Sequence, residues 1–220
     1  MIGEMTLVLA GSREVSSVLV VDDEEDARRS YSWLISDLDL DPRLVDAPHP
    51  PSLEAFADRI PGLADAVLCD HHLRTHNYAQ FNGAELVSLL YERVPAVLCT
   101  RWEERDIDEI RPYLDRIPAL LRRTDEESLR RGLESCAREF VEGRPPSRRP
   151  WRTQVHVQEV ERDTVYVNLP GWTSLHMFGL RHAAFPPHVR DALTEDLRLY
   201  AEVNLGAEAP EDVYFRAWTL

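Results

Sequence analysis

The stretch Val18–Tyr31, which reads VLVVDDEEDARRSY, decides the fold of the first part of the chain. It opens with a short run of valine and leucine, reaches two aspartates, and continues with a pattern that places Leu34 and Ile35 on one face of a helix. A short apolar strand that leads straight into an amphipathic helix is typical of a βα unit. We therefore expect a strand at Ser17–Val21 and a helix at Glu24–Asp37.

The same alternation of strand and helix continues along the chain. Further strands are expected at Arg43–Asp46, Ala66–Cys69, Ala96–Cys99 and Pro118–Leu121, and further helices at Ser52–Ile60, Ala84–Arg93, Glu103–Leu114 and Asp125–Phe140. Five short apolar strands that alternate with five helices predict a doubly wound α/β domain, with a mostly parallel five-stranded sheet covered on both faces. Ligands of such domains lie at the carboxyl ends of the strands.

The pattern changes after this domain. Residues 142–150 (EGRPPSRRP) contain three prolines and three arginines and have no apolar period, so we interpret them as a stiff linker. Beyond them, apolar residues alternate on either side of a hairpin turn at Arg162 and Asp163, which predicts strands. We expect an extension at 1–14, the α/β domain at 15–141, the linker at 142–150, and a small β-rich domain, barrel or sandwich, at 151–220.

Composition narrows the classes of function. The 220 residues carry a formal net charge of −14, and both predicted domains have more acidic than basic residues, so we expect no nucleic-acid partner. All 25 basic residues are arginine. The apolar runs are too short for a membrane span, and the three cysteines form no CxxC pair, so we expect reduced thiols, no membrane association and a cytoplasmic protein.

Acidic residues follow two of the predicted strands. Asp22 and Asp23 end the first strand, Asp70 ends the third, and Thr100 ends the fourth. In a parallel sheet these residues meet at one edge, where three carboxylates would repel each other unless a hard cation such as Mg²⁺ lies among them. With the charge neutralised, one carboxylate could attack a phosphoryl group in line. The sequence thus predicts a magnesium site with phosphoryl-transfer chemistry.

The motifs VLVVDDEEDARRSY, AVLCDHHL, FNGAELVSLL and AVLCT, in this order and spacing, resemble the receiver domains of bacterial two-component response regulators over about 125 residues. The resemblance implies that Asp22, Asp23, Asp70 and the backbone carbonyl of His72 hold Mg²⁺. It also implies that a histidine kinase phosphorylates Asp70 and that Thr100 orients the phosphoryl group. A homodimer through the fourth and fifth helices is a further expectation from the family.

The sequence departs from the family pattern at the end of the fifth strand and after the fourth. Arg122 replaces the lysine of the family, Ala119 replaces the aromatic residue that reports phosphorylation, and Arg101 and Trp102 stand where a small residue is usual. Arginine is longer than lysine and carries a planar, forked guanidinium group. Arg122 could therefore bind a phosphoryl group, but not with the compact ammonium charge that a lysine supplies. These departures keep open a second hypothesis, in which the chain is a pseudo-receiver adaptor that binds a kinase or effector and is never phosphorylated.

Two metal hypotheses are weaker. His72 and His76 are four residues apart, but they lie in a predicted loop, where that spacing does not bring side chains together. Asp70, His71 and His72 match the DHH element of metal-dependent phosphoesterases, but the glycine-containing early element of that family is missing. No glycine-rich phosphate loop or Ser-His-Asp order is present either, so we expect no independent catalytic domain, and we expect the output to be binding of a protein effector.

Overall fold

The structure is a computed structural model that describes residues 7–8, 14–48, 52–74, 77–100, 104–122, 124–172 and 176–220. Contacts between residues divide the chain into two units. The first comprises Met1–Trp102 and Arg116–Gly143, and the second comprises Glu103–Asp115 and Arg144–Leu220. The domain boundaries expected from the sequence stay a prediction, because contacts alone do not show which segments fold independently.

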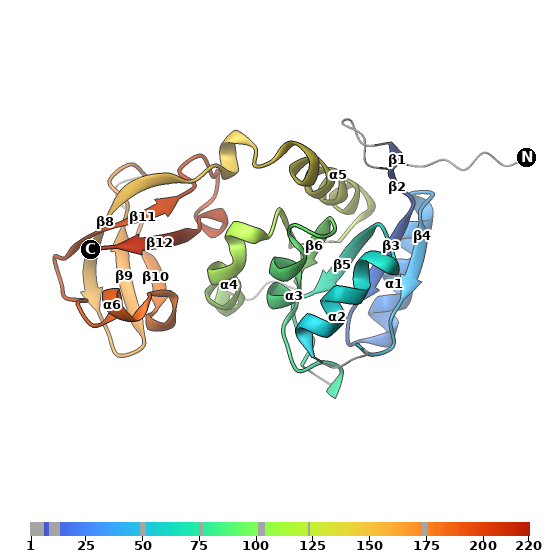
Figure 1. Cartoon of the computed structure of the whole chain (residues 1–220), viewed down its shortest axis with the longest axis horizontal. Coiled ribbons are helices and arrows are strands. Elements are labelled where there is room, and N and C mark those ends of the chain that lie inside the picture. The colour runs from blue at the N-terminus through green and yellow to red at the C-terminus, as the bar shows by residue number, and fades with distance from the viewer. Residues whose placement is uncertain are drawn as a thin grey trace, which may run out of the picture. The chain divides into compact units, whose positions relative to one another are not determined.

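The first unit is built on a five-stranded parallel sheet (Figure 1). Its strands are β3 (Ser17–Val21), β4 (Asp41–Leu44), β5 (Ala66–Asp70), β6 (Ala96–Cys99) and β7 (Ala119–Leu121), and its helices are α1 (Glu25–Asp37), α2 (Leu53–Arg59), α3 (Gly83–Leu90) and α5 (Glu126–Glu142). The order in the sheet is β4-β3-β5-β6-β7, and every neighbouring pair is parallel. This is the 2-1-3-4-5 order of flavodoxin-like domains, so the predicted doubly wound α/β fold is confirmed.

Helices cover both faces of this sheet. Val18 and Val20 of β3 pack in one core cluster with Ile35 of α1 and with Leu133 of α5. The intervening residues of β3 point to the opposite face, because side chains alternate along a strand, and α2 and α3 contact each other there. Strands buried on both faces explain the continuous apolar runs in the sequence.

Two short strands precede β3 and form a small sheet of their own. Leu7–Val8 (β1) pairs antiparallel with Glu14–Val15 (β2), across the expected boundary between the N-terminal extension and the α/β domain. Asp65, just before β5, accepts four hydrogen bonds from the amides and hydroxyls of Ser16 and Ser17, at 2.7–3.1 Å. Partial burial acts to raise the pKa of Asp65, but these hydrogen bonds outweigh it and lower the pKa below its ordinary value.

The start of α3 lies unusually close to the end of β5. The amide of Gly83 donates a hydrogen bond to the carbonyl of His71 at 2.9 Å. A Cβ atom at Gly83 would lie 1.9 Å from the backbone oxygen of Asp70, a distance that no rotation of a side chain can relieve. Asn82 and Glu85 form a capping box that fixes the same helix end. Glycine is therefore required here by the close approach of two backbone segments.

We predict that Gly83→Ala lowers the free energy of unfolding by about 1–3 kcal/mol, because the added methyl group must push α3 away from β5. Urea denaturation followed by circular dichroism measures the change. Gly62→Ala is the matched control, since a Cβ at Gly62 meets no atom within 4 Å. Equal stability of the two variants would contradict the close approach.

The second unit contains a five-stranded antiparallel sheet that curls into a half-barrel. Its elements are β8 (Trp151–Val160), β9 (Thr164–Asn168), β10 (Phe178–Arg181), α6 (Pro187–Arg190), β11 (Arg198–Val203) and β12 (Phe215–Thr219), in the sheet order β10-β9-β8-β11-β12. The β-rich character of this region is as predicted. Its core includes Val155 and Val157, buried together with Phe178, Phe185 and Trp218.

One helix of the predicted α/β pattern is grouped with this second unit. Helix α4 (Glu104–Ile110) and the 3-10 helix that follows it contact β10 and the residues before β12. Arg111 makes the main link: its Nη1 donates to the carbonyls of Pro210 at 3.1 Å and Val213 at 2.5 Å. Its guanidinium carbon lies 5.7 Å from the centre of the Phe178 ring. Burial lowers the pKa of Arg111 to about 10, which still leaves it charged at neutral pH.

Arginines from the predicted linker hold the end of the same segment. Arg144 and Arg148 donate from Nη2 to the carbonyl of Asp115, at 3.1 and 3.2 Å. Arg216 of β12 lies 3.6 Å from the carboxylate of Asp115. The hydroxyl of Tyr214 donates to the carbonyl of Arg148 at 2.6 Å, so residues after 143 are packed within this unit.

We predict that Arg111→Met loosens α4 within the second unit. The two carbonyls that Arg111 bonds would lose their donor, and an unsatisfied buried carbonyl costs about 1–3 kcal/mol. Hydrogen exchange of amides in Glu104–Ile110 should become faster than in wild type. Arg116→Met, at an exposed neighbouring arginine, is the control and should leave the exchange unchanged. Identical exchange in the two variants would show that Arg111 does not anchor this helix.

Candidate functional site

The carboxyl ends of β3, β5, β6 and β7 bring the predicted site residues to one edge of the parallel sheet. The register pairs Val21 with Cys69 and Asp70 with Cys99, so Asp22, Asp70 and Thr100 follow one another across neighbouring strands. The amide of Thr100 donates to the carbonyl of Leu121 at 3.0 Å, which joins the ends of β6 and β7. This edge includes the point where the strand order reverses, between β3 and β5, and ligands of doubly wound folds bind there.

Asp22 is the most buried carboxylate of the group, with 3% of its surface exposed. The pKa of Asp22 is raised to about 6, chiefly by burial and further by the charges of Asp70 and Asp23. The amide of Glu24 donates a hydrogen bond to Oδ1 at 2.8 Å, which acts to lower the pKa. The three carboxylates therefore lie close enough to repel each other, as the sequence predicted.

Asp70 ends β5 and is partly buried. The amide of His72 donates to its Oδ2 at 2.7 Å. Burial raises the pKa of Asp70, and the His72 amide opposes this shift without cancelling it, while the charge of Asp23 raises the pKa further. One oxygen of the carboxylate is thus fixed by the backbone, which orients the whole group.

Thr100 and the cysteines line the base of the site. Thr100 is 5% exposed, and Cys69 and Cys99 are fully or almost fully buried. The Cys99 thiol donates to the carbonyl of Cys69 at 3.3 Å and lies 3.8 Å from the hydroxyl of Tyr31, whose pKa is raised chiefly by burial. Both cysteines are free and buried, and they pack as small apolar residues.

Sequence reasoning missed Arg28 of α1. It is 8% exposed, and its Nη1 donates to the backbone carbonyl of Asp22 at 2.7 Å. Its guanidinium carbon lies 5.6 Å from the centre of the Tyr78 ring, and the Tyr78 hydroxyl donates to the carbonyl of Val45 at 2.8 Å. The available signal was an arginine three residues before Tyr31, on the face of the helix that carries its apolar residues.

For the other predicted site residues, the structure gives mainly their position and burial. Arg122 directly follows β7 and is half-buried, and Ala119 is half-buried against the core cluster. His71 is 1% exposed, and its ring meets that of His72 edge to face, with the ring centres 4.9 Å apart. Arg101, Trp102 and His76 lie outside the described residues, so the zinc hypothesis for His72 and His76 stays a prediction.

Mg²⁺ fits part of this arrangement. In the described ranges, no three side chains of His, Cys, Asp or Glu converge closely enough to hold a metal by themselves. Mg²⁺ commonly takes only one or two carboxylates and keeps several waters, however. Burial chiefly raises the pKa of Asp22, and the charges of Asp70 and Asp23 raise it further. A cation would relieve this repulsion, so the chemistry of the three carboxylates suits Mg²⁺. The proposed ligation by the carbonyl of His72 stays a prediction.

The strand order gives the first unit the flavodoxin-like doubly wound topology, with acids at the ends of β3 and β5. Solved structures similar to it include a response regulator receiver domain protein from Clostridium thermocellum (13% identity, TM-score 0.43, 56% of this chain and 94% of that one). A CheY-like receiver domain from Methylobacillus flagellatus has 21% identity and a TM-score of 0.41, over 56% of this chain and 98% of that one. The match with full-length FixJ from B. japonicum has 20% identity and a TM-score of 0.43, and it covers 57% of this chain and 59% of that one. No protein-family model and no curated protein matches the chain.

We predict that Asp22 makes stability depend on pH in the absence of Mg²⁺. Its folded pKa of about 6 exceeds the ordinary value of 3.8, so the folded state holds more protons within this window. The free energy of unfolding should therefore fall, by about 2 kcal/mol, as the pH rises through the window. Asp22→Asn should remove this fall and be more stable than wild type at pH 7, as measured by urea denaturation.

Asp65→Asn is the control of opposite sign. Because the pKa of Asp65 is lowered on folding, its contribution is present above the unfolded pKa and is lost as the pH falls. This variant should be less stable than wild type at pH 7. A stabilising effect of Asp65→Asn, or a destabilising effect of Asp22→Asn, would contradict the electrostatics described here.

Proposed function

We propose that this chain is a two-component response regulator that accepts a phosphoryl group on Asp70 from a histidine kinase. The observation that carries the proposal is the set of partly buried, mutually repelling carboxylates at the switch point of a receiver-like sheet. Keeping such charges together costs free energy. A role in binding a cation and a phosphoryl group accounts for that cost, whereas a purely structural role does not.

In this mechanism an oxygen of Asp70 attacks the phosphorus of the donor, and the bond from phosphorus to the donor breaks. Asp22 and Asp23, together with Asp70 and the His72 carbonyl, would hold Mg²⁺, which supplies positive charge for the phosphoryl oxygens when bound. The His72 amide fixes the orientation of the attacking carboxylate. The Thr100 hydroxyl would donate to a phosphoryl oxygen, and Arg122 would supply the cation that is a lysine elsewhere in the family.

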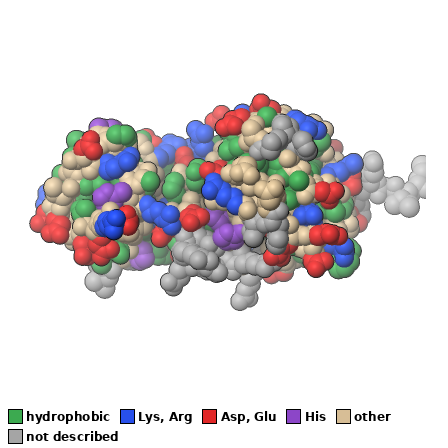
Figure 2. Space-filling model, turned by 90° about the horizontal axis from the view of Figure 1, so that it is seen from below, with side chains coloured by type: hydrophobic (Ala, Val, Ile, Leu, Met, Phe, Trp, Pro, Cys, Tyr) green, Lys and Arg blue, Asp and Glu red, His purple; other side chains and the backbone are tan. Residues whose placement is uncertain are grey.

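We further propose that the output is binding of a protein effector in the cytoplasm. The net charge of −14 disfavours nucleic acid. Figure 2 shows arginines interspersed with acidic residues on the visible face, among the residues that the structure describes. None of the helices in the described part of the chain is long and apolar enough to cross a bilayer. A homodimer is part of the proposal only by resemblance to the family.

The second candidate is a pseudo-receiver adaptor, which binds a kinase or effector without being phosphorylated. Arg122 at the end of β7 and the small Ala119 within it favour this candidate, because both change the part of the fold that would respond to a phosphoryl group. The two candidates differ in one measurable property, the chemistry of Asp70.

The deciding experiment measures the intact mass of the full chain after incubation with Mg²⁺ and acetyl phosphate. We expect a phosphoryl adduct on the wild type and none on Asp70→Asn, with less adduct on Thr100→Ala because a donor to the phosphoryl group is lost. Asp65→Asn is a matched control outside the site and should form the adduct. Absence of an adduct together with absence of Mg²⁺ binding in a calorimetric titration would reject the phosphoacceptor role and support the adaptor.

A further inference from the structure

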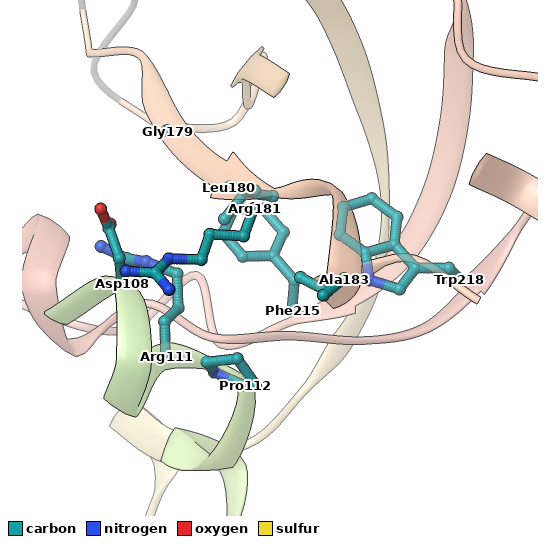
Figure 3. Close-up of a pocket in the computed structure, with 10 residues that line it drawn as sticks. Asp108, Arg111, Pro112, Gly179, Leu180, Arg181, Ala183, Phe215 and Trp218 are labelled. Atoms are coloured by element: carbon teal, nitrogen blue, oxygen red, sulfur yellow. The ribbon is translucent and has the colours of Figure 1, made fainter. Parts of the chain in front are cut away.

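A pocket of about 130 Å³ lies within the second unit, between α4 and the strands β10 and β12 (Figure 3). Its apolar wall includes Pro112, Ala183, Phe215 and Trp218. The rings of Phe215 and Trp218 are parallel to within 5°, with their centres 5.5 Å apart. An engineered apolar cavity of about 150 Å³ is known to hold benzene, so this pocket has room for one aromatic ring.

Charged groups gather at one end of the pocket. Figure 3 shows the guanidinium groups of Arg111 and Arg181 near Asp108, with Trp218 at the opposite end. No other charged residue of the described chain lines the pocket, so its wall carries two positive charges and one negative charge. Acids outside the wall also lie near these arginines, since Glu109 pairs with Arg181 and the charges of Glu211 and Asp212 act on Arg111.

Arg181 has the hydrogen-bonding capacity that a ligand would need. Its side chain is 50% exposed, and its ion pair with Glu109 has an N to O distance of 3.6 Å, which is longer than a hydrogen bond. Among the residues that the structure describes, its guanidinium donates no hydrogen bond. Arg111, in contrast, already donates to two carbonyls and shapes the pocket. The guanidinium group of Arg181 is therefore the group that can donate hydrogen bonds to a planar acceptor such as a carboxylate.

We propose that this pocket binds a small aromatic carboxylate, with its ring against Phe215 and Trp218 and its carboxylate on Arg181. A guanidinium group donates two parallel hydrogen bonds to a carboxylate, which makes it the side chain best suited to recognise this group. The volume is close to that of a cavity that holds one aromatic ring, so a single-ring acid is the ligand that we assign. The proposal concerns the second unit alone and does not depend on phosphorylation of Asp70.

The position of the pocket gives such a ligand an effect on the fold. Asp108, Arg111 and Pro112 belong to α4 and the turn after it, whereas the other walls come from the sheet. A bound acid would contact both and hold α4 on the sheet, because a ligand stabilises the conformation that it binds.

Calorimetric titration of the full-length protein with benzoate tests the proposal. Benzyl alcohol and acetate are the matched probes, since the first has the ring without the carboxylate and the second has the carboxylate without the ring. We expect benzoate to bind more tightly than either. Arg181→Gln should weaken benzoate binding about tenfold or more, the usual effect of losing a charged hydrogen-bonding partner.

Three further variants separate a specific site from general electrostatic attraction. Arg162→Gln removes the same charge from the exposed turn between β8 and β9 and should leave benzoate binding unchanged. Asp108→Asn should tighten binding, because it removes a negative charge from the charged end. Ala183→Leu fills the pocket from an exposed position and should abolish binding while the circular dichroism spectrum stays that of wild type.

Amide hydrogen exchange gives an independent readout. Benzoate should slow exchange in Glu104–Ile110 of the wild type and have no effect on Ala183→Leu. Absence of benzoate binding to the wild type would overturn the proposal. Equal binding to wild type and Arg181→Gln, or equal binding of benzoate and benzyl alcohol, would overturn the assignment of a carboxylate ligand.

Discussion

Parallel pairing of β3 with β5 is the constraint on which the site depends. Because Val21 pairs with Cys69, the residues that follow in each strand, Asp22 and Asp70, must emerge at the same edge of the sheet. Asp22 is buried at this edge and Asp70 is partly buried, so their charges interact more strongly than they would in water. Burial, reinforced by the charges of Asp70 and Asp23, raises the pKa of Asp22 to about 6.

Several backbone contacts hold this unfavourable arrangement in place. The amides of Glu24 and His72 donate to the carboxylates of Asp22 and Asp70, and Arg28 binds the backbone carbonyl of Asp22. The approach of α3 to β5, which only glycine at position 83 permits, fixes the backbone on the other side of Asp70. A site held by the main chain and by a buried arginine is preorganised, so its geometry does not depend on flexible surface groups.

The second unit uses a segment that the chain places between two strands of the first. Helix α4 lies in sequence between β6 and β7, yet it contacts β10. The 3-10 helix that follows it bonds through Arg111 to Pro210 and Val213. Arg111 is the clearest reason, because its buried guanidinium needs the carbonyls of Pro210 and Val213. The segment that joins Thr100 to Arg122 is therefore also part of the wall of a pocket in the other unit.

The sequence by itself determined the class of the first fold and the membership of its acidic cluster. Apolar runs of four or five residues that end at Asp22 and Asp70 indicate buried parallel strands, because strands covered on both faces need no polar side chains. Since parallel strands run in the same direction, the two acids lie at the same edge of the sheet. Only the tertiary structure decided the burial of Arg28, the existence of β10, the attachment of α4 and the pocket beside Arg181. Each of these depends on contacts between residues far apart in the chain, such as Arg111 with Val213, and local periodicity carries no information about such pairs.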